Sequence, residues 1–229
     1  MNSIIAFDLY QTLIFKSGLE ERVRNFLLTN KGIDMTHSDI VRANREMYTR
    51  RKLKHKSFAN EKERQSYFIN YNQEFLAILG VSLSIEESEV LNHDLKNLPY
   101  ELYDDVITAL DAFKKNGYML GIISNWAQFS IKEILEMHNI EHYFDFIHLS
   151  SVIGFSKPDE RIFEDVLRLA QEQKKEKIYY VGDDYELDIA SAQKVGIIPI
   201  LIDRLNMHIA PTCKKITSLT DLTKFIHLE

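Results

Sequence analysis

The sequence is poor in cysteine, glycine and proline, and each shortage excludes a class of protein. Its one cysteine, Cys213, has no partner for an intramolecular disulfide and cannot build a cysteine-rich zinc site. Such sparse use of cysteine fits a reducing compartment, so we expect a cytoplasmic location. Eight glycines and four prolines in 229 residues are less than half of the roughly 12% typical of proteins, which excludes collagen-like repeats and long flexible linkers.

Long hydrophobic runs and a positive net charge are missing as well. No apolar run approaches the ~20 residues that cross a lipid bilayer, so we expect no membrane-spanning helix. The first ten residues have no basic start and only a short apolar run, so we expect no secretory signal there. The formal net charge of −6 argues against a general nucleic-acid-binding protein, which normally carries a basic surface.

Short apolar runs alternate with segments of helical periodicity at the start and in the second half of the chain. The runs that are typical of buried strands cover residues 4–7, 119–123, 146–149, 178–181 and 197–202. Apolar residues recur at spacings of three and four over 104–116, 130–138 and 159–173. Strands that alternate with helices predict right-handed crossovers, and therefore an α/β fold with a Rossmann-like parallel sheet.

Residues 16–98 differ from the rest because they contain no strand-like run. Apolar residues recur there at helical spacing, as Val23 and Phe26 do. We expect three to five helices in this segment, which form a cap domain inserted after the first strand. The predicted division is a core domain over 1–15 and 99–229, with the helical cap domain over 16–98.

Polar residues collect where the predicted strands end. They are Asp8, Thr12, Ser124, Asn125, Lys157, Asp183 and Asp184, with Asp188 just beyond. Ligands of an open parallel sheet bind beyond the carboxyl ends of its strands, so we expect these side chains in one site. A single aspartate after a strand is ordinarily a turn or cap residue, but four such places in chain order are hard to explain in that way.

Four motifs carry these polar residues. They read Phe-Asp-Leu-Tyr-Gln-Thr-Leu at 7–13, Ile-Ile-Ser-Asn at 122–125, Gly-Phe-Ser-Lys-Pro-Asp at 154–159 and Val-Gly-Asp-Asp-Tyr-Glu-Leu-Asp at 181–188. In this order the motifs resemble those of the haloacid dehalogenase-like hydrolase superfamily, and residues 16–98 resemble its helical cap. The match is specific for the superfamily and not for a substrate.

The resemblance implies a role for each motif residue. Asp8 would attack phosphorus and form an aspartyl-phosphate, which divides one difficult hydrolysis into two steps. Ser124 would hydrogen-bond the transferring phosphoryl group, and Lys157 would neutralise its charge and restrain Asp8. The implied catalytic residues are therefore Asp8, Ser124 and Lys157. The implied phosphate-binding residues are Thr12, Ser124, Asn125 and Lys157.

A cation at this edge of the sheet is expected from charge as well as from the resemblance. Two carboxylates about 4 Å apart repel by ~4 kcal/mol at an effective dielectric of about 20, and one lysine offsets only part of that repulsion. A divalent cation removes the remainder and lets the site accept a phosphate dianion. The resemblance implies Mg²⁺, held by Asp8, the backbone carbonyl of Tyr10, Asp183 and Asp184.

Tyr10 departs from the phosphatase pattern of the superfamily. Its phosphatases normally have an aspartate there, as general acid and base, whereas a tyrosine is similar to the first motif of the 2-haloacid dehalogenases. Those enzymes use no metal, and small neutral residues stand where this chain has Asp183 and Asp184. We therefore favour an Mg²⁺-dependent phosphatase acting on a small phosphorylated metabolite. The alternatives are a 2-haloacid dehalogenase and a catalytically weak phosphate-binding or interaction protein.

Three further features have an ordinary interpretation and a functional one. Asp188 would orient Lys157 or the metal's waters, or would cap a helix. Arg204 is expected at the surface or in a salt bridge rather than in catalysis. A basic run over 42–56 is either a solvated helix face or a surface for a second anionic group of the substrate. Its residues are Arg42, Arg45, Arg50, Arg51, Lys52, Lys54 and Lys56.

Overall fold

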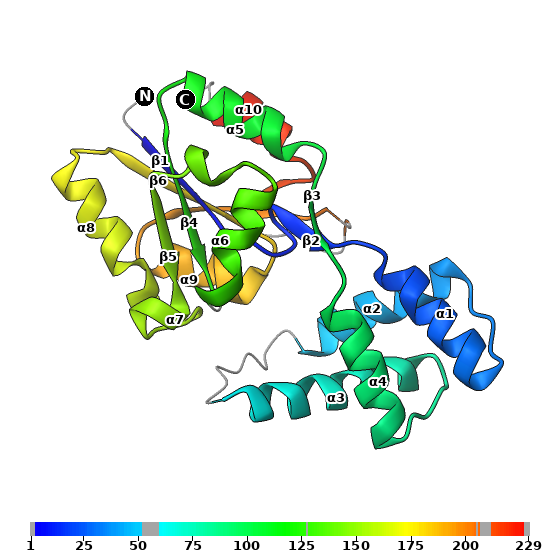
Figure 1. Ribbon diagram of the computed structural model, residues 1–229. Coiled ribbons are helices and arrows are strands. Elements are labelled where there is room, and N and C mark those ends of the chain that lie inside the picture. The colour runs from blue at the N-terminus through cyan, green and yellow to red at the C-terminus, as the bar shows by residue number, and fades with distance from the viewer. Residues whose placement is uncertain (1–2, 52–59, 127, 205, 207–211, 227–229) are drawn as a thin grey trace. The chain divides into compact units, whose positions relative to one another are not determined.

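The computed structural model describes residues 3–51, 60–126, 128–204, 206 and 212–226 (Figure 1). The chain divides into two compact units, one formed by Met1–Phe15 with Glu101–Glu229 and the other by Lys16–Tyr100. Within the described residues, no helix has both the length and the apolar character that crossing a membrane requires. The role of the second unit as a cap stays a prediction.

The first unit is built on a six-stranded sheet in the order β5-β4-β1-β6-β7-β8, in which every neighbouring pair is parallel. Its strands are β1 (Ser3–Phe7), β4 (Met119–Ser124), β5 (Phe146–Leu149), β6 (Lys177–Gly182), β7 (Ile198–Ile202) and β8 (Lys214–Ile216). This sheet confirms the prediction of an α/β, Rossmann-like core.

Helices cover both faces of this sheet, so its central strands can be apolar on both sides. The helical elements of the unit are α5 (Val106–Lys115), α6 (Gln128–Met137), η1 (Glu141–Tyr143), α7 (Ser150–Ile153), η2 (Glu160–Phe163), α8 (Glu164–Glu172), η3 (Tyr185–Ala190), α9 (Ser191–Lys194) and α10 (Leu219–Ile226). On one face Ala6 shares a buried cluster with Val166 of α8 and Ala192 of α9. Phe7 points to the opposite face, where its ring lies 6.1 Å from that of Phe113 in α5. Helix α10 lies beside α5 (Figure 1).

The described part of the second unit consists of α1 (Leu19–Lys31), α2 (His37–Arg51), α3 (Glu61–Ile78) and α4 (Ile85–Lys96), in agreement with the helices predicted there. Val23, Phe26, Ile40 and Phe75 belong to its buried core. Helix α4 begins in a capping box, in which the side chains of Ser84 and Glu87 each accept a hydrogen bond from the other's backbone N–H.

Two short strands pair at the boundary between the units, where the chain leaves the first unit and where it returns. They are β2 (Ile14–Lys16) and β3 (Tyr100–Leu102). Beside them the N–H of Ser17 donates to the carbonyl of Pro99 at 3.0 Å. Strands of three residues are too short to produce a periodic pattern, so the sequence does not predict them.

Candidate active site

Asp8 stands at the carboxyl end of β1, in the middle of the sheet. Its backbone N–H still donates to the carbonyl of Val181 in β6, at 2.8 Å. After β4 the chain continues outward to β5 on one side, and after β6 it continues to β7 on the other. Asp8 therefore lies at the point where the strand order reverses, which is where ligands of open α/β sheets bind.

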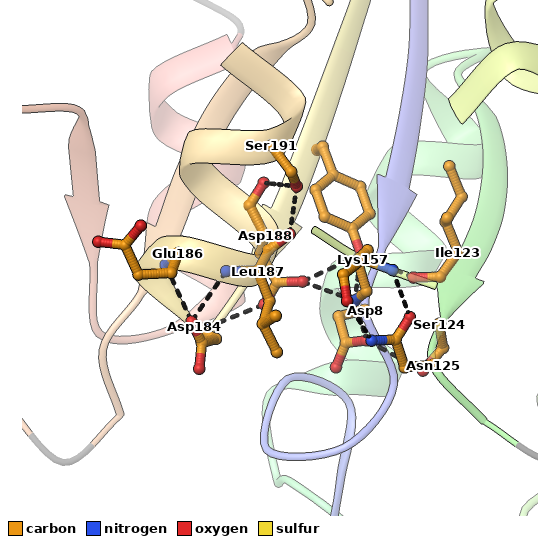
Figure 2. A network of polar contacts seen from close by, with 11 residues as sticks. Asp8, Ile123, Ser124, Asn125, Lys157, Asp184, Glu186, Leu187, Asp188 and Ser191 are labelled. Atoms are coloured by element: carbon orange, nitrogen blue, oxygen red, sulfur yellow. Dashed lines mark hydrogen bonds and ion pairs between the residues drawn. The ribbon is translucent and has the colours of Figure 1, made fainter. Parts of the chain in front are cut away.

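Lys157 connects Asp8 to the other buried groups of the site (Figure 2). Its Nζ lies 2.6 Å from Oδ1 of Asp8, 2.6 Å from Oδ1 of Asp188 and 2.8 Å from the hydroxyl of Tyr180. The lysine side chain is only 2% exposed. A lysine ammonium has three hydrogens, so each of them has one protein acceptor.

The charges of this group are shaped by burial. Burial raises the pKa of Asp8 above its ordinary value; Lys157 acts in the opposite direction, and Asp188 adds to the rise. Burial also acts to lower the pKa of Lys157, but the charges of Asp188 and Asp8 outweigh it and hold that pKa well above the ordinary value. Lys157 therefore stays a cation, shared between two buried carboxylates.

Ser124 and Asn125 follow β4 and reach the same place. Oγ of Ser124 donates to Oδ1 of Asp8 at 3.0 Å. The amide of Asn125 instead holds the backbone of Lys157, because its Nδ2 donates to the Lys157 carbonyl at 2.9 Å and its Oδ1 accepts from the Lys157 N–H at 2.7 Å. Asn125 thus fixes the loop that carries the lysine, and its predicted contact with phosphate stays a prediction.

Of the acidic residues after β6, some form a candidate metal-binding group and one caps a helical turn. Asp8, Asp183 and Asp188 each offer one carboxylate oxygen within 4.8 Å of the other two, which forms a candidate metal-binding group among the described residues. Asp184, a ligand in the sequence-based interpretation, is not in this group. Its Oδ1 accepts the N–H groups of Glu186 and Leu187 at 2.9 Å each, and so caps the π-helical turn η3.

Asp188 uses both of its oxygens inside the protein. Oδ1 accepts from Lys157, and Oδ2 accepts the N–H of Asp184 at 2.9 Å. Of the interpretations open from the sequence, the structure favours the one in which Asp188 orients Lys157. The close approach of this carboxyl group to β6 is possible because residue 182 is glycine: a Cβ there would lie 2.3 Å from Cγ of Asp188.

Arg204 holds the loop that follows Asp8. Its Nε and Nη2 donate to the carbonyl of Thr12 at 3.1 and 2.6 Å. Its guanidinium pairs with Asp105 at 3.1 Å and lies 3.7 Å from the ring centre of Tyr103. The side chain is 10% exposed, so of the two places expected for Arg204 it occupies the salt bridge and not the surface.

Thr12 and Tyr10 complete the loop after β1. Oγ1 of Thr12 is buried and has no hydrogen-bond partner among the described residues. The ring of Tyr10 is half-buried and lies 6.4 Å from the ring of Trp126, between centroids. Gln11 has a φ of 63°, which is uncommon for a residue with a side chain, and its Oε1 accepts the hydroxyl of Tyr103 at 2.6 Å.

The basic run over 42–56 is only partly described. Arg42 pairs with Asp39 at 3.1 Å, and Arg50 pairs with Glu46 at 2.5 Å, all on exposed side chains of α2. These two pairs are typical of a solvated helix face. Lys52, Lys54 and Lys56 lie outside the described residues, as do the side chains of Arg45 and Arg51.

Comparison with known proteins assigns this arrangement to a family. The family model described as haloacid dehalogenase-like hydrolase matches residues 7–202. The chain is 27% identical over 208 residues to glyceraldehyde 3-phosphate phosphatase of Methanothermobacter thermautotrophicus, covering 89% of this chain and 86% of that protein. It is also 27% identical over 138 residues to pyrophosphatase PpaX of Bacillus cereus, covering 54% of this chain and 63% of that protein.

Solved structures share the fold at lower identity. The HAD-hydrolase YfnB of Bacillus subtilis, bound to magnesium, superimposes with a TM-score of 0.68 at 18% identity and 98% coverage of both chains. The L-2-haloacid dehalogenase RSc1362 superimposes with a TM-score of 0.66, also at 18% identity and 98% coverage of both. Similarity of fold alone therefore does not decide between the two kinds of chemistry.

Proposed function

Because the chain belongs to the haloacid dehalogenase-like hydrolase family, we propose that it is an Mg²⁺-dependent phosphatase, acting in the cytoplasm on a small phosphorylated metabolite through an aspartyl-phosphate. The family makes it a hydrolase, and phosphatases are among its relatives. The proposal adds the metal, the covalent intermediate and the kind of substrate.

The observation that carries the proposal is the arrangement of hydrogen bonds at Asp8. Among the described residues, both side-chain donors to this carboxylate, Ser124 and Lys157, reach Oδ1. Oδ2 is thereby the oxygen that can attack. Its lone pair would form the bond to phosphorus while the leaving group departs with the electrons of the old bond, and a water would then hydrolyse the aspartyl-phosphate and return Asp8.

Ser124 and Lys157 would hold Asp8 in line for this attack. On the phosphoryl group Lys157 would act mainly by its charge, since its three hydrogens already have acceptors on Asp8, Asp188 and Tyr180. A fixed cation in a buried site stabilises negative charge that develops on the phosphoryl oxygens more strongly than it would in water.

The acidic group fits Mg²⁺ by its chemistry. It offers only carboxylate oxygens, and Asp8, Asp183 and Asp188 together carry more negative charge than Lys157 balances. We assign the ion to Asp8, Asp183 and the backbone carbonyl of Tyr10, beside an Asp188 that Lys157 and the N–H of Asp184 hold in place. Bound Mg²⁺ supplies charge neutralisation at the transferring phosphoryl group.

Tyr10 favours a second candidate, a 2-haloacid dehalogenase. Halide leaves without a proton, so such a reaction needs no acid at position 10. The acidic group argues against it, because Asp183 and Asp188 beside Asp8 would repel the carboxylate of a haloacid unless a cation were present.

One experiment separates these candidates. The purified protein is given an aryl phosphate or 2-chloropropionate, each with Mg²⁺ and with a chelator, and phosphate or chloride release is measured. Phosphate release that needs Mg²⁺ supports the phosphatase. Chloride release that persists in chelator supports the dehalogenase. If neither phosphate nor chloride is released, the third alternative, a phosphate-binding or interaction protein, is supported. Asp8→Asn is the control that must abolish any activity assigned to this site.

A further inference from the structure

The hydroxyl of Tyr180 lies within the buried network but has no part in the proposed reaction. Tyr180 is fully buried on β6. Its hydroxyl accepts from Nζ of Lys157 at 2.8 Å and lies 2.6 Å from the carbonyl oxygen of Ile123. A phenol has one hydrogen, and the shorter contact to Ile123 takes it in preference to Oδ1 of Asp188 at 3.3 Å.

The strand register explains how this side chain reaches two other segments. Tyr180 pairs with Ala6 of β1, and Ala6 pairs with Gly121 of β4. Registered residues of parallel strands point to the same face, so the tyrosine side chain shares its face with Ala6 and Gly121, the two small residues that pair in line between β6 and β4. Phe163 fixes the ring from the other side, edge to face at 5.2 Å between centroids.

We infer that Tyr180 is a positioning residue, whose hydroxyl fixes the Lys157 ammonium and the carboxyl end of β4 in one geometry around Asp8. Ile123 immediately precedes Ser124, the other donor to Asp8, so a single phenol restrains both donors. Without it, one hydrogen of the buried ammonium loses its acceptor, and Lys157 is free to move between Asp8 and Asp188. The inference rests on the proposed function of Asp8 as nucleophile.

The test compares Tyr180→Phe with Tyr118→Phe. Tyr118 is the matched control, because it is also buried, its hydroxyl donates to the backbone carbonyl of Ile226 at 3.3 Å, and its ring meets Phe113 edge to face. Both variants keep their ring and lose one hydroxyl. We measure thermal unfolding together with kcat and KM for an aryl phosphate with Mg²⁺.

Tyr180→Phe should lower kcat by about 10- to 100-fold with KM changed less than about threefold, since misplaced catalytic groups slow the chemical step. Tyr118→Phe should lower the melting temperature by a similar amount to Tyr180→Phe but keep kcat within about twofold of the wild type. The inference is overturned if kcat of Tyr180→Phe falls less than about tenfold, if the loss lies in KM, or if the two variants lose kcat equally.

A second readout needs no turnover. The side-chain N–H signal of Lys157, assigned with protein labelled in its lysine Nζ, should exchange slowly with water in the wild type and at least about tenfold faster in Tyr180→Phe, because one hydrogen loses its acceptor. Fast exchange in the wild type would overturn the inference without any variant. If the wild type hydrolyses nothing, the proposed function fails, and this signal still decides the role of Tyr180.

Discussion

The carboxyl group of Asp188 lies directly against the backbone of Gly182. A Cβ at residue 182 would stand 2.4 Å from Cβ and 2.3 Å from Cγ of Asp188, closer than real atoms approach. The strand that leads to the acidic motif therefore has to lack a side chain at its last residue. Only then can Asp188 reach Lys157 at 2.6 Å.

Gly182→Ala should displace Asp188 and leave Lys157 with one carboxylate in place of two. We expect a loss of ~1–3 kcal/mol in the free energy of unfolding, measured with urea, and a fall of roughly tenfold or more in kcat. Gly196→Ala is the control: Gly196 has a φ of 78°, which strains any side chain, so the change should destabilise the fold without the same loss of kcat. Equal losses of kcat would contradict the role given to Asp188.

Asp8→Asn should abolish turnover and leave the fold intact, because an amide of the same shape cannot attack phosphorus. The fall in kcat should be roughly 10³-fold or more, as for other covalent nucleophiles. Beryllofluoride should be trapped by the wild type and not by the variant. Asp104→Asn, at an exposed aspartate, should behave as the wild type in both assays. Hydrolysis that persists in Asp8→Asn would disprove the covalent mechanism.

Tyr10 should make the rate depend on the leaving group. With no aspartate at that position, aryl and acyl phosphates should be cleaved far better than alkyl phosphates, whose departing oxygen needs a proton. Tyr10→Asp should restore part of ~10²–10⁴ in rate for alkyl phosphates, equal to ~2.7–5.5 kcal/mol. A series of phosphates of graded leaving-group pKa measures this, and a flat series in the wild type would show that another group supplies the proton.

Arg204→Met should destabilise the loop after β1. The change removes two hydrogen bonds to the carbonyl of Thr12 and leaves Asp105 without its cation. Breaking a largely buried pair from one side costs about 3 kcal/mol, which urea unfolding would detect. The double variant Arg204→Met, Asp105→Asn should recover part of that loss. A double variant that is as unstable as the sum of the single ones would indicate that the two residues do not interact.

Asp105 should make stability fall in acid. Burial acts to raise its pKa, but hydrogen bonds from Arg204 and Ser218, the charge of Arg204 and the N–H of Leu219 outweigh burial and hold the pKa below its ordinary value of 3.8. The folded protein thus binds this proton less tightly than the unfolded chain does. The contribution of Asp105 is therefore fully present above the ordinary value and is lost as the pH falls through the folded pKa.

The measurement is the difference in free energy of unfolding between the wild type and Asp105→Asn across acid pH. This difference should be constant above about pH 5 and should shrink towards about pH 3. A difference that stays constant throughout would contradict the pairing.

The strands could be predicted from the sequence where both faces of a strand are covered. Ile4–Phe7 are fully buried, and such strands appear as continuous apolar runs. Strand β8 was missed because it reads Lys-Lys-Ile and lies at the edge of the sheet, where burial leaves little pattern. Its backbone pairs with β7 and so forms a strand, but the pattern of apolar residues in the sequence does not reveal this pairing.

Within the site, the sequence predicted which strand ends meet but not which side chains turn inward. Asp8, Ser124 and Lys157 come together because parallel strands share one carboxyl edge. Whether Asp184 or Asp188 turns its carboxylate towards Lys157 depends on where η3 begins, since Asp184, as the capping residue, turns its own carboxylate to the backbone. Tyr180 gave no signal at all, because a tyrosine in a buried strand looks like any other core residue.

The pairing of β2 with β3 has a consequence for how such a chain can change. The two connections to the helical unit are paired with each other, so its 85 residues are inserted into the core at one pair of hydrogen-bonded strands. The entropy cost of closing a loop grows only with the logarithm of its length. A longer or shorter segment between β2 and β3 therefore changes the free energy of folding of the core only slightly. Insertion, shortening or exchange of the whole helical segment can thus occur at a single locus, while the register of β1 with β4 and β6 is preserved.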